Sequence, residues 1–378
     1  MHHESRKPGF GQPILIAAIS GRALAVSARR AGYAPLVVDM FCDQDTIAAA
    51  QAHVRLTSGL ARGMDGDELL SALQALALLH APTGIVCGTG FEDRPQLLAQ
   101  LAQRWTLIGN SAETIAMVKD PQAFAALCRS HGIPHPELSL VLPREPTDWL
   151  AKRRGGSGGT HIKAAQERNA SEAIYFQRRV TGMPVSALFL ADGRRAEIIG
   201  FSTQWASPTP QQLFRYGGAV RPADITPSLA ALLRETVQVL VPAIPLIGLN
   251  SADFLVEDGN FWLMEINPRP SATLDIFEPP GGSLFALHVA ACEGKLPQTP
   301  PRIDGAAAAA IAYAKDDIAS LAPLQWPDWT ADRPHAGVAV AAGEPLCTVR
   351  ASGGTAAEAK ALLNQRLAAV LAWTRAEM

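Results

Sequence analysis

Apolar runs typical of buried strands alternate with helical patterns in the N-terminal part of the chain. Strands are predicted at 14–19, 35–39, 84–87 and 106–108, and helices at 21–30 and 94–105. Strands that alternate with helices indicate βαβ units around a parallel sheet. Asn110, followed three residues later by Glu113, predicts a helix N-cap with its reciprocal partner.

The pattern changes after Asp120-Pro121, where an acid at the N-cap and a proline in the first turn predict the start of a helix that ends at Gly132. The elements predicted beyond it are strands at 149–152, 160–163 and 175–180, a hairpin turning at Asp192-Gly193, and a helix over 228–240. Further strands are expected near Val338 and Thr348. A long helix should start at Thr355, with Glu358 in the capping-box position.

The most informative polar pattern lies between residues 249 and 270. It predicts two strands joined at Asp258-Gly259, because the runs are rich in Phe, Val, Trp and Ile and the dipeptide favours positive φ. Side chains alternate between the faces of a strand, so the pattern can be sorted by parity. The wholly apolar set, expected to face a core, is Phe254, Val256, Trp262, Met264 and Ile266. The other face carries Asp253, Glu265 and Asn267.

The apolar set also predicts the register of this hairpin. A three-residue loop, 258–260, pairs Glu257 with Phe261 and places Asp253 opposite Glu265, with Cβ atoms roughly 5 Å apart. A two-residue turn would put the two acids on opposite faces. Paired carboxylates repel unless a cation lies between them, and two carboxylates with an amide suit Mg²⁺. Arg269, two residues after Asn267, adds a partner for phosphate, which favours a metal site over two solvated acids.

Composition narrows the class of protein. The 378 residues suffice for two or three domains, and the formal charge of -2 gives no footprint for nucleic acid or an anionic membrane. Five cysteines are scattered singly without metal-ligand spacing, which indicates a reducing compartment: Cys42, Cys87, Cys128, Cys292 and Cys347. No signal peptide or long apolar run is evident, so a soluble cytoplasmic protein is expected, with no membrane partner.

Two glycine-containing turns suggest ligand binding. Ser20-Gly21-Arg22 follows the first strand and Asp39 ends the second, but the spacing of a dinucleotide fingerprint is missing, which favours a simple turn that could still hold a substrate. The second turn comprises Gly155, Gly156, Ser157, Gly158 and Gly159. Lys152 precedes it, and Lys163 lies on the next strand. Glycine-rich runs are often only flexible loops, but backbone N–H groups beside a lysine can also hold phosphates.

Taken in order, these motifs resemble the ATP-grasp superfamily of carboxylate–amine ligases, from about residue 13 to at least residue 300. The resemblance implies a combined α/β and α+β fold in four parts. These are an N-terminal Rossmann-like (pre-ATP-grasp) domain with a parallel sheet (1–115), a small lid (116–184), a larger antiparallel-sheet part for metal and substrate (185–300), and a C-terminal extension that completes it (301–378). The run 214–218 is similar to the branch of predicted ATP-dependent carboligases, some of which are suspected in cofactor biosynthesis.

The resemblance also implies roles for individual residues. Lys119 and Lys152 are expected to bind ATP, with the loop 155–159 closing over its phosphates. Lys152 and Arg269 are expected to act on the reacting phosphate. The adenine-binding hinge is expected at Gln177, Arg179 and Val180, where many members of the family have a glutamate in place of Gln177. Asp253, Glu265 and Asn267 match the Mg²⁺ ligands. An acid that often holds the ribose is missing from 184–186.

The implied reaction forms an amide from a small carboxylate and an amine through an acylphosphate. ATP and two Mg²⁺ ions are the expected cofactors, with Mn²⁺ as a substitute, and a homodimer is compatible with the family. Arg215, Tyr216 and Arg221 are candidates for recognising an anionic substrate, although ordinary surface arginines are nearly as compatible with the pattern. The alternatives are a phosphotransferase on the same fold, a nonenzymatic nucleotide sensor, and a nicotinamide oxidoreductase, which the missing glycine fingerprint disfavours.

Overall fold

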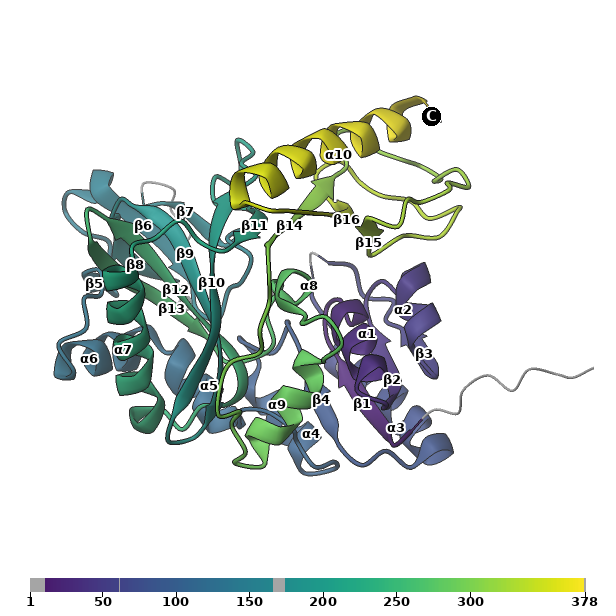
Figure 1. Cartoon of the computed structure of the whole chain (residues 1–378), viewed down its shortest axis with the longest axis horizontal. Coiled ribbons are helices and arrows are strands. Elements are labelled where there is room, and N and C mark those ends of the chain that lie inside the picture. Colours follow the sequence, from purple (N-terminus) through teal and green to yellow (C-terminus); the bar gives the residue numbers. More distant parts are fainter. Residues whose placement is uncertain (1–10, 61, 166–173, 377–378) are drawn as a thin grey trace, which may run out of the picture.

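The computed structural model describes residues 11–60, 62–165 and 174–376. Within these residues the named strands form three sheets (Figure 1). A parallel sheet lies at the N-terminal end, a small antiparallel sheet lies at the opposite side of the molecule, and an eight-stranded antiparallel sheet connects them. The mixed α/β architecture predicted from the pattern is therefore present.

The N-terminal sheet is parallel and has the order β3-β2-β1-β4. Its strands are β1 (Pro13–Ala17), β2 (Ala34–Asp39), β3 (Ala52–Arg55) and β4 (Ile85–Cys87). Its helices are α1 (Arg22–Arg30), α2 (Gln44–Ala49), α3 (Gly66–His80) and α4 (Pro95–Ala102). Strand β2 is buried along its whole length, as expected for a parallel sheet with helices on both faces. The strand predicted at 106–108 is reduced to a single bridge between Leu107 and Ile85.

Two short helices lead from this sheet to the rest of the chain, α5 (Ala112–Lys119) and α6 (Pro121–Ser130). Asp120 caps α6 as predicted, by accepting the Ala123 N–H at 2.8 Å. The cap predicted for α5 is wrong, because Ser111 accepts the Thr114 N–H instead. Asn110 turns away from the helix, and its amide donates to Asn250 Oδ1 at 2.8 Å. It therefore ties the N-terminal part to the large sheet.

The small sheet has the order β5-β8-β6-β7 and is antiparallel. Its strands are β5 (Leu138–Ser139), β6 (Trp149–Arg153), β7 (Ile162–Ala164) and β8 (Ile174–Arg178), and a 3₁₀ turn, η1 (Pro146–Asp148), precedes β6. β7 begins two residues later than predicted, and β8 ends two residues earlier, before Val180. The glycine-rich loop joins β6 to β7.

The large sheet has the order β13-β12-β9-β10-β11-β14-β16-β15. Its strands are β9 (Met183–Asp192), β10 (Ala196–Ala206), β11 (Tyr216–Arg221), β12 (Ile247–Glu257), β13 (Asn260–Asn267), β14 (Ala306–Tyr313), β15 (Thr330–Ala331) and β16 (Pro345–Gly353). The C-terminal strands β14 to β16 thus belong to the same sheet as the acidic hairpin. The domain boundaries given above remain predictions.

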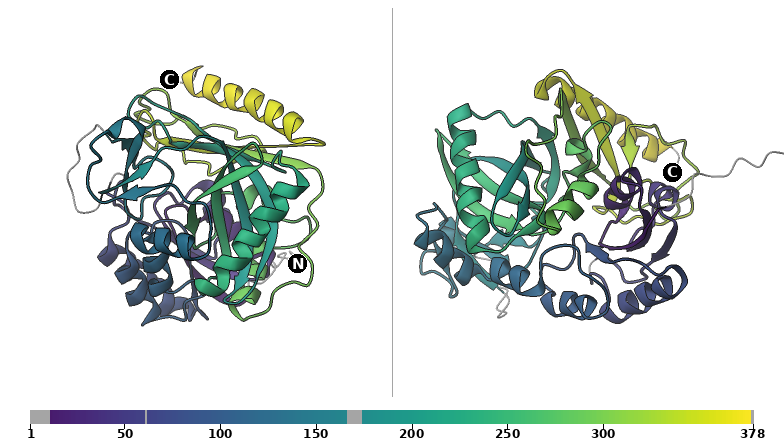
Figure 2. Two further views of the ribbon diagram at one scale, coloured as in Figure 1. Left: turned by 90° about the vertical axis from the view of Figure 1, so that its left-hand side faces the viewer. Right: turned by 60° about the horizontal axis from the view of Figure 1, so that its bottom comes forward.

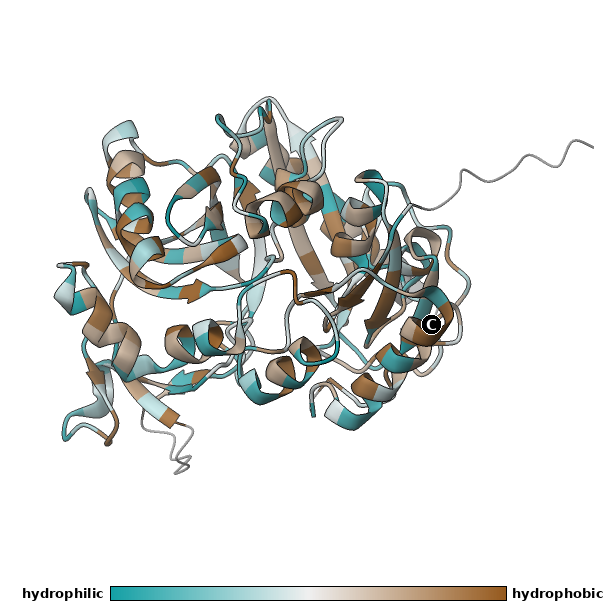
Figure 3. Cartoon of the chain, turned by 90° about the horizontal axis from the view of Figure 1, so that it is seen from below, coloured by the Kyte–Doolittle hydropathy of each residue, from teal (hydrophilic) through white to brown (hydrophobic). Residues whose placement is uncertain are grey.

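Helices cover this sheet on both faces. They are α7 (Pro227–Ala243), α8 (Leu274–Phe277), α9 (Leu284–Cys292) and α10 (Ala356–Ala376). Leu233 and Leu240 of α7 pack with Phe189 and Phe254 of the sheet, and burial of such apolar side chains is the main stabilising contribution. Helix α10 lies over β14 and β16, with Glu358 in the predicted capping box (Figure 2). Figure 3 shows hydrophobic residues along the inner strands and hydrophilic residues on outer helix faces.

The hairpin of β12 and β13 has the predicted pairing of Asp253 with Glu265, but its turn and register differ from the prediction. Its turn has two residues, Asp258 and Gly259, both with positive φ, so Glu257 pairs with Asn260 rather than Phe261. A bulge at Met264 then shifts the register by one residue and places Asp253 opposite Glu265.

The predicted apolar face is therefore partly wrong. Before the bulge, Phe261 and Leu263 face the core, at 7% and 0% exposure, whereas Trp262 is 38% exposed and Met264 is only partly buried. Phe254, Val256 and Ile266 are buried as expected. The helices described here are all too short or too polar to cross a bilayer.

Candidate functional site

Two carboxylates and an amide meet on the hairpin. Asp253 lies opposite Glu265, and the Asn267 amide nitrogen donates to both, at 2.9 Å to Asp253 Oδ2 and 3.4 Å to Glu265 Oε1. The Ser186 hydroxyl on the neighbouring strand β9 donates to Asp253 Oδ1 at 2.6 Å. The bulge at Met264 keeps Asp253 and Glu265 on one face of the sheet, so both acids are held by paired strands.

Lys119 brings a positive charge to this set from the C-terminal end of α5. Its ammonium lies 3.4 Å from Glu265 Oε2 and 3.2 Å from Asn267 Oδ1, and its side chain is only 8% exposed. Burial opposes ionisation of Glu265, but Lys119 and Lys152 outweigh burial and lower the pKa of that carboxyl. Burial and then repulsion by Glu265 raise the pKa of Asp253. The pair is thus arranged so that a nearby cation relieves the repulsion.

The donor set fits Mg²⁺, which prefers oxygen ligands and often takes only one or two carboxylates. Asp253, Glu265 and Asn267 supply carboxylate and amide oxygens from adjacent strands. Across the described residues no group of three or more His, Cys, Asp or Glu side chains could hold a metal ion.

Lys152 on β6 points toward the same region from the small antiparallel sheet. It is buried, its ammonium donates to Gln177 Oε1 at 2.7 Å, and burial lowers its pKa although Glu265 partly offsets that effect. Gln177, the residue predicted for the hinge, is also buried. Its acceptor oxygen is engaged by Lys152, so an adenine amino group would have to share or replace that bond.

The glycine-rich loop lies between the small antiparallel sheet, the N-terminal part and the strand β11. A Cβ atom on Gly155 would come within 2.7 Å of Glu92 O, and one on Gly159 within 1.8 Å of Phe214 O. Gly158 O accepts the Tyr216 N–H at 2.9 Å. These contacts require glycine at the two close approaches. The cavity between Lys119, Gln177 and Glu265 has a volume of about 30 Å³, and Gly155 and Gly156 of this loop line it.

Arg269 is held by a residue that the sequence analysis missed. Its Nε donates to Glu92 Oε1 at 2.8 Å, and Glu92 Oε2 accepts the Gly90 N–H at 2.7 Å. Burial opposes ionisation of Glu92, but Arg269 and then Lys119 lower its pKa. Glu92 lies after β4, and loops at the carboxyl ends of parallel strands commonly carry functional groups. Its position in the loop after a strand of the parallel sheet is the sequence feature that could have identified Glu92.

The remaining hinge residues lie outside this cluster. The Arg179 N–H donates to Asp148 O at 2.7 Å, and its side chain is exposed. Val180 is half-buried and follows β8. Any role of these two residues in adenine binding stays a prediction about their backbone.

The three candidates for substrate recognition are placed differently. The Arg215 guanidinium donates to Ser207 O at 2.9 Å and Gly343 O at 3.0 Å, and it stacks over the Tyr313 ring. Arg221 donates to Ile276 O and to Gly305 O, the latter at 2.9 Å. Both arginines are thus engaged by main-chain carbonyls, which leaves little capacity for an anion. Tyr216 lines a large cavity beside the hairpin.

Asp39 argues against the dinucleotide alternative. Its carboxylate accepts the N–H groups of Gly21 at 2.8 Å and Cys42 at 2.7 Å, and a Cβ on Gly21 would lie 2.6 Å from Val37. The glycine and the acid therefore serve the turn itself. The carboxylate of Asp39 is already engaged by backbone N–H groups of the turns that follow β1 and β2.

Comparison with known proteins relates part of the chain to a known family of domains. Residues 121–273 match the family model of the ATP-grasp domain. This part of the chain is similar to an ATP-grasp domain. The matched residues run from the start of α6 to just beyond the acidic hairpin, so they include the glycine-rich loop and the three candidate metal ligands.

Relatives extend the likeness over more of the chain. The carbamoyl phosphate synthase large chain of Rubrobacter xylanophilus is 23% identical over 320 residues, covering 76% of this chain and 29% of that protein. That of Deinococcus deserti is 24% identical over 220 residues, covering 51% and 21%. The chain therefore spans less than a third of the length of these curated relatives.

Solved structures share the ATP-grasp fold. N5-carboxyaminoimidazole synthetase from Staphylococcus aureus superposes with a TM-score of 0.69 at 16% identity, covering 96% of this chain and 98% of that one. Pyruvate carboxylase from Rhizobium etli superposes with a TM-score of 0.75 at 17% identity, covering 94% and 37%. The fold class predicted from the sequence is thereby confirmed.

Proposed function

We propose that this protein is an ATP-dependent carboxylate–amine ligase. The observation that carries the proposal is the convergence of Lys119, Asp253, Glu265 and Asn267 at one place, beside a glycine-rich loop and Arg269. Relatives named carbamoyl phosphate synthase large chain and neighbours named biotin carboxylase support ATP-driven chemistry at a carboxylate.

In this proposal, different residues bind ATP, hold the metal and act on the reacting phosphate. Lys119, Lys152 and the loop amides would hold the phosphates of ATP, and Gln177 with the backbone at 179 and 180 would meet adenine. Asp253, Glu265 and Asn267 would hold two Mg²⁺ ions, for which Mn²⁺ could substitute. When bound, the metal would neutralise the charge of the phosphates. Arg269, oriented by Glu92, would direct its donors at the phosphoryl group where negative charge develops.

The proposed reaction has two steps, phosphorylation of a carboxylate and formation of an amide. A carboxylate oxygen of the first substrate attacks the γ-phosphorus, the bond to the bridging oxygen breaks, and ADP leaves. The amine nitrogen of the second substrate then attacks the acyl carbon, phosphate leaves, and the nitrogen loses a proton. A closed loop excludes the water that would hydrolyse the acylphosphate. Bicarbonate belongs in the substrate panel, because one neighbouring structure contains bicarbonate with MgADP.

The five free cysteines support a reducing compartment such as the cytoplasm. A role in cofactor biosynthesis rests on the family branch alone. A neighbouring biotin carboxylase domain is a dimer, which supports testing for a homodimer.

The test is Mg²⁺-dependent ADP release with a panel of carboxylates and amines. We expect release that requires both co-substrates and falls by roughly 100-fold in Glu265→Gln. The matched control is Glu257→Gln, an exposed acid on the same hairpin, which should behave as wild type. Addition of hydroxylamine should trap a hydroxamate. ADP release without any hydroxamate would favour the phosphotransferase, and ATP binding without turnover would favour the sensor.

A further inference from the structure

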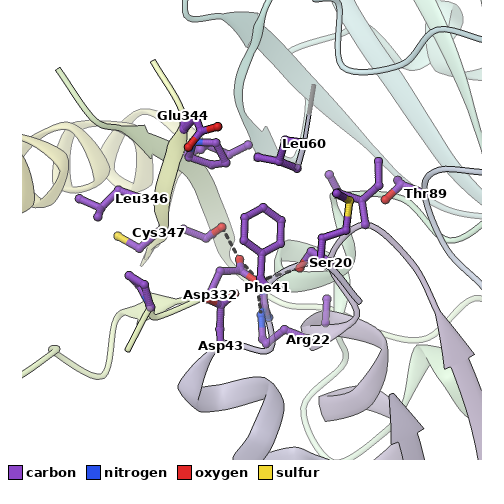
Figure 4. A pocket seen from close by; sticks show the side chains of 18 of the residues that line it. Ser20, Arg22, Phe41, Asp43, Leu60, Thr89, Asp332, Glu344, Leu346 and Cys347 are labelled. Atoms are coloured by element: carbon purple, nitrogen blue, oxygen red, sulfur yellow. Dashed lines mark hydrogen bonds and ion pairs between the residues drawn. The ribbon is translucent and has the colours of Figure 1, made fainter. Parts of the chain in front are cut away.

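A cavity of about 810 Å³ adjoins the proposed reaction site. It lies between the N-terminal sheet, the segment after Arg269 and the C-terminal strands β14 and β16 (Figure 4). Pro270 and Ser271, directly after Arg269, form part of its wall, and so do Gly88 and Thr89, just before Glu92. Its volume lies in the range of small-molecule sites, roughly 300–1,000 Å³.

The cavity has an apolar wall and an acidic end. Phe41, Leu60 and Leu346 line the apolar part, whereas Asp43 and Asp332 lie together at one end (Figure 4). Such a division fits a ligand with an apolar body and a cationic group. Most of the charge at the acidic end is already balanced, however, so each acid has to be considered separately.

Arg22 neutralises two acids that line this end of the cavity, Asp275 and Asp332. Its NH1 and NH2 groups each lie 2.5 Å from an oxygen of Asp275, and its Nε and NH2 each lie 3.0 Å from an oxygen of Asp332. Asp332 also accepts the hydroxyls of Ser20 and Thr348. These contacts satisfy the guanidinium and both carboxylates.

Asp45 is satisfied by the backbone. It accepts the N–H groups of Asp332 and Arg333, both at 2.9 Å. It therefore holds the loop that carries Asp332 against α2, and Arg22 Nε, 3.8 Å from its Oδ2, adds a compensating charge.

Asp43 is different from these neighbours. It is 5% exposed, it lines the cavity, and none of the described residues donates a hydrogen bond to its carboxylate. Burial, followed by repulsion from Asp332, Asp39 and Asp45, raises its pKa to about 8. A buried carboxylate without a donor is unfavourable, which favours the protonated acid at neutral pH, and a cation beside it would stabilise the ionised form. The preceding Cys42 has a positive φ of 46°, a conformation that non-glycine residues rarely adopt outside constrained sites.

We infer that this cavity binds a substrate with an apolar body and an ammonium group, and that Asp43 anchors the ammonium. The other end of the substrate would reach Pro270 and Ser271, beside Arg269. The inference rests on the proposed function only in calling this ligand a substrate. Binding of an organic ammonium at Asp43 is independent of that function.

The test compares three probes of similar shape by calorimetry on the full chain: phenethylamine, 2-phenylethanol and 3-phenylpropionate. We expect phenethylamine to bind at least tenfold more tightly than either of the others, as for one charge-assisted hydrogen bond. Asp43→Asn should remove this preference. Glu344→Gln should retain it, because Glu344 lines the same cavity and already accepts the Ala341 N–H.

Equal binding of the three probes by wild type would overturn the inference, and so would a preference that survives Asp43→Asn or is lost equally in Glu344→Gln. The probe comparison on wild type does not depend on how well the variant folds. ADP release is measured separately. A clear ammonium preference without ADP release would contradict the ligase and leave the binding site standing.

Discussion

Arg269 Nε donates to Glu92 Oε1 at 2.8 Å, across 177 residues of sequence. The side chain of Glu92 is 2% exposed and that of Arg269 is 11% exposed, so little solvent screens the pair. The ion pair joins the loop after β4 to the end of β13. It fixes the orientation of the one arginine proposed to face the reacting phosphate.

Glu92→Gln should therefore lower the rate of ADP release. The amide keeps the size of the side chain but loses the charge that orients Arg269, and misplacement of a catalytic group by about 1 Å can cost roughly 100-fold. We expect kcat to fall by about ten- to 100-fold with little change in KM for ATP, because Lys119 and Lys152 remain. Steady-state kinetics would separate the two constants, and Glu293→Gln, at an exposed acid, is the control. An unchanged kcat would show that Glu92 does not position Arg269.

Lys119→Met should destabilise the metal-free protein and increase its response to Mg²⁺. The lysine contacts both Glu265 and Asn267, so its loss removes the nearest positive charge from two facing carboxylates. Glu265 is 39% exposed, and the expected loss is therefore only about 1 kcal/mol. Thermal unfolding should show a lower Tm that added MgCl₂ raises more in the variant than in wild type. Lys315→Met, at an exposed position, should show neither effect.

Local patterns predicted much of the fold. The strands β1, β2 and β6 and the caps at Asp120 and Glu358 depend on neighbouring residues, and they were predicted with small boundary errors. The pairing of Asp253 with Glu265 was also predicted, although two errors cancelled. The two-residue turn alone would have separated the acids, and the bulge at Met264 restored the pairing. A bulge has no distinct local signal in this strand.

Long-range contacts account for what was missed. Asn110 has a cap-like sequence, yet its amide binds Asn250 and Pro268 because burial against the large sheet offers better partners than the helix end. Glu92 and Asp43 lie in loops, and apart from the position of Glu92 after β4, nothing nearby in sequence distinguishes these two acids from solvated ones. Their roles depend on elements that only folding brings together.

Gly159 and Gly158 form a matched pair for testing loop closure. Both have positive φ, 74° and 65°, so alanine at either position carries a backbone cost of about 1 kcal/mol. Only at Gly159 would the new Cβ collide with the Phe214 carbonyl, at 1.8 Å, whereas the position at Gly158 is open. We expect Gly159→Ala to lower kcat by more than tenfold and to increase proteolysis of the loop, with Gly158→Ala close to wild type. Equal effects would mean that strain, and not closure, limits the rate.

His288 should make the protein sensitive to acid. Its Nδ1 accepts the Leu249 N–H at 2.8 Å and its Nε2 faces Ile108 O at 3.0 Å, so the neutral ring satisfies both partners and protonation of Nδ1 would lose one. Burial lowers its pKa from 6.5 to about 4. Between these values the unfolded chain binds the proton and the folded chain does not, so stability falls as pH falls through this window.

The expected loss between pH 6.5 and pH 4 is about 3 kcal/mol from this residue. Urea unfolding at a series of pH values measures it. His288→Gln keeps a donor and an acceptor but does not titrate, so its stability should depend less on pH in this window, by about one proton. His53→Gln changes an exposed histidine on β3 and should retain the wild-type slope. If His288→Gln also retained that slope, the acid sensitivity would have to arise from other groups.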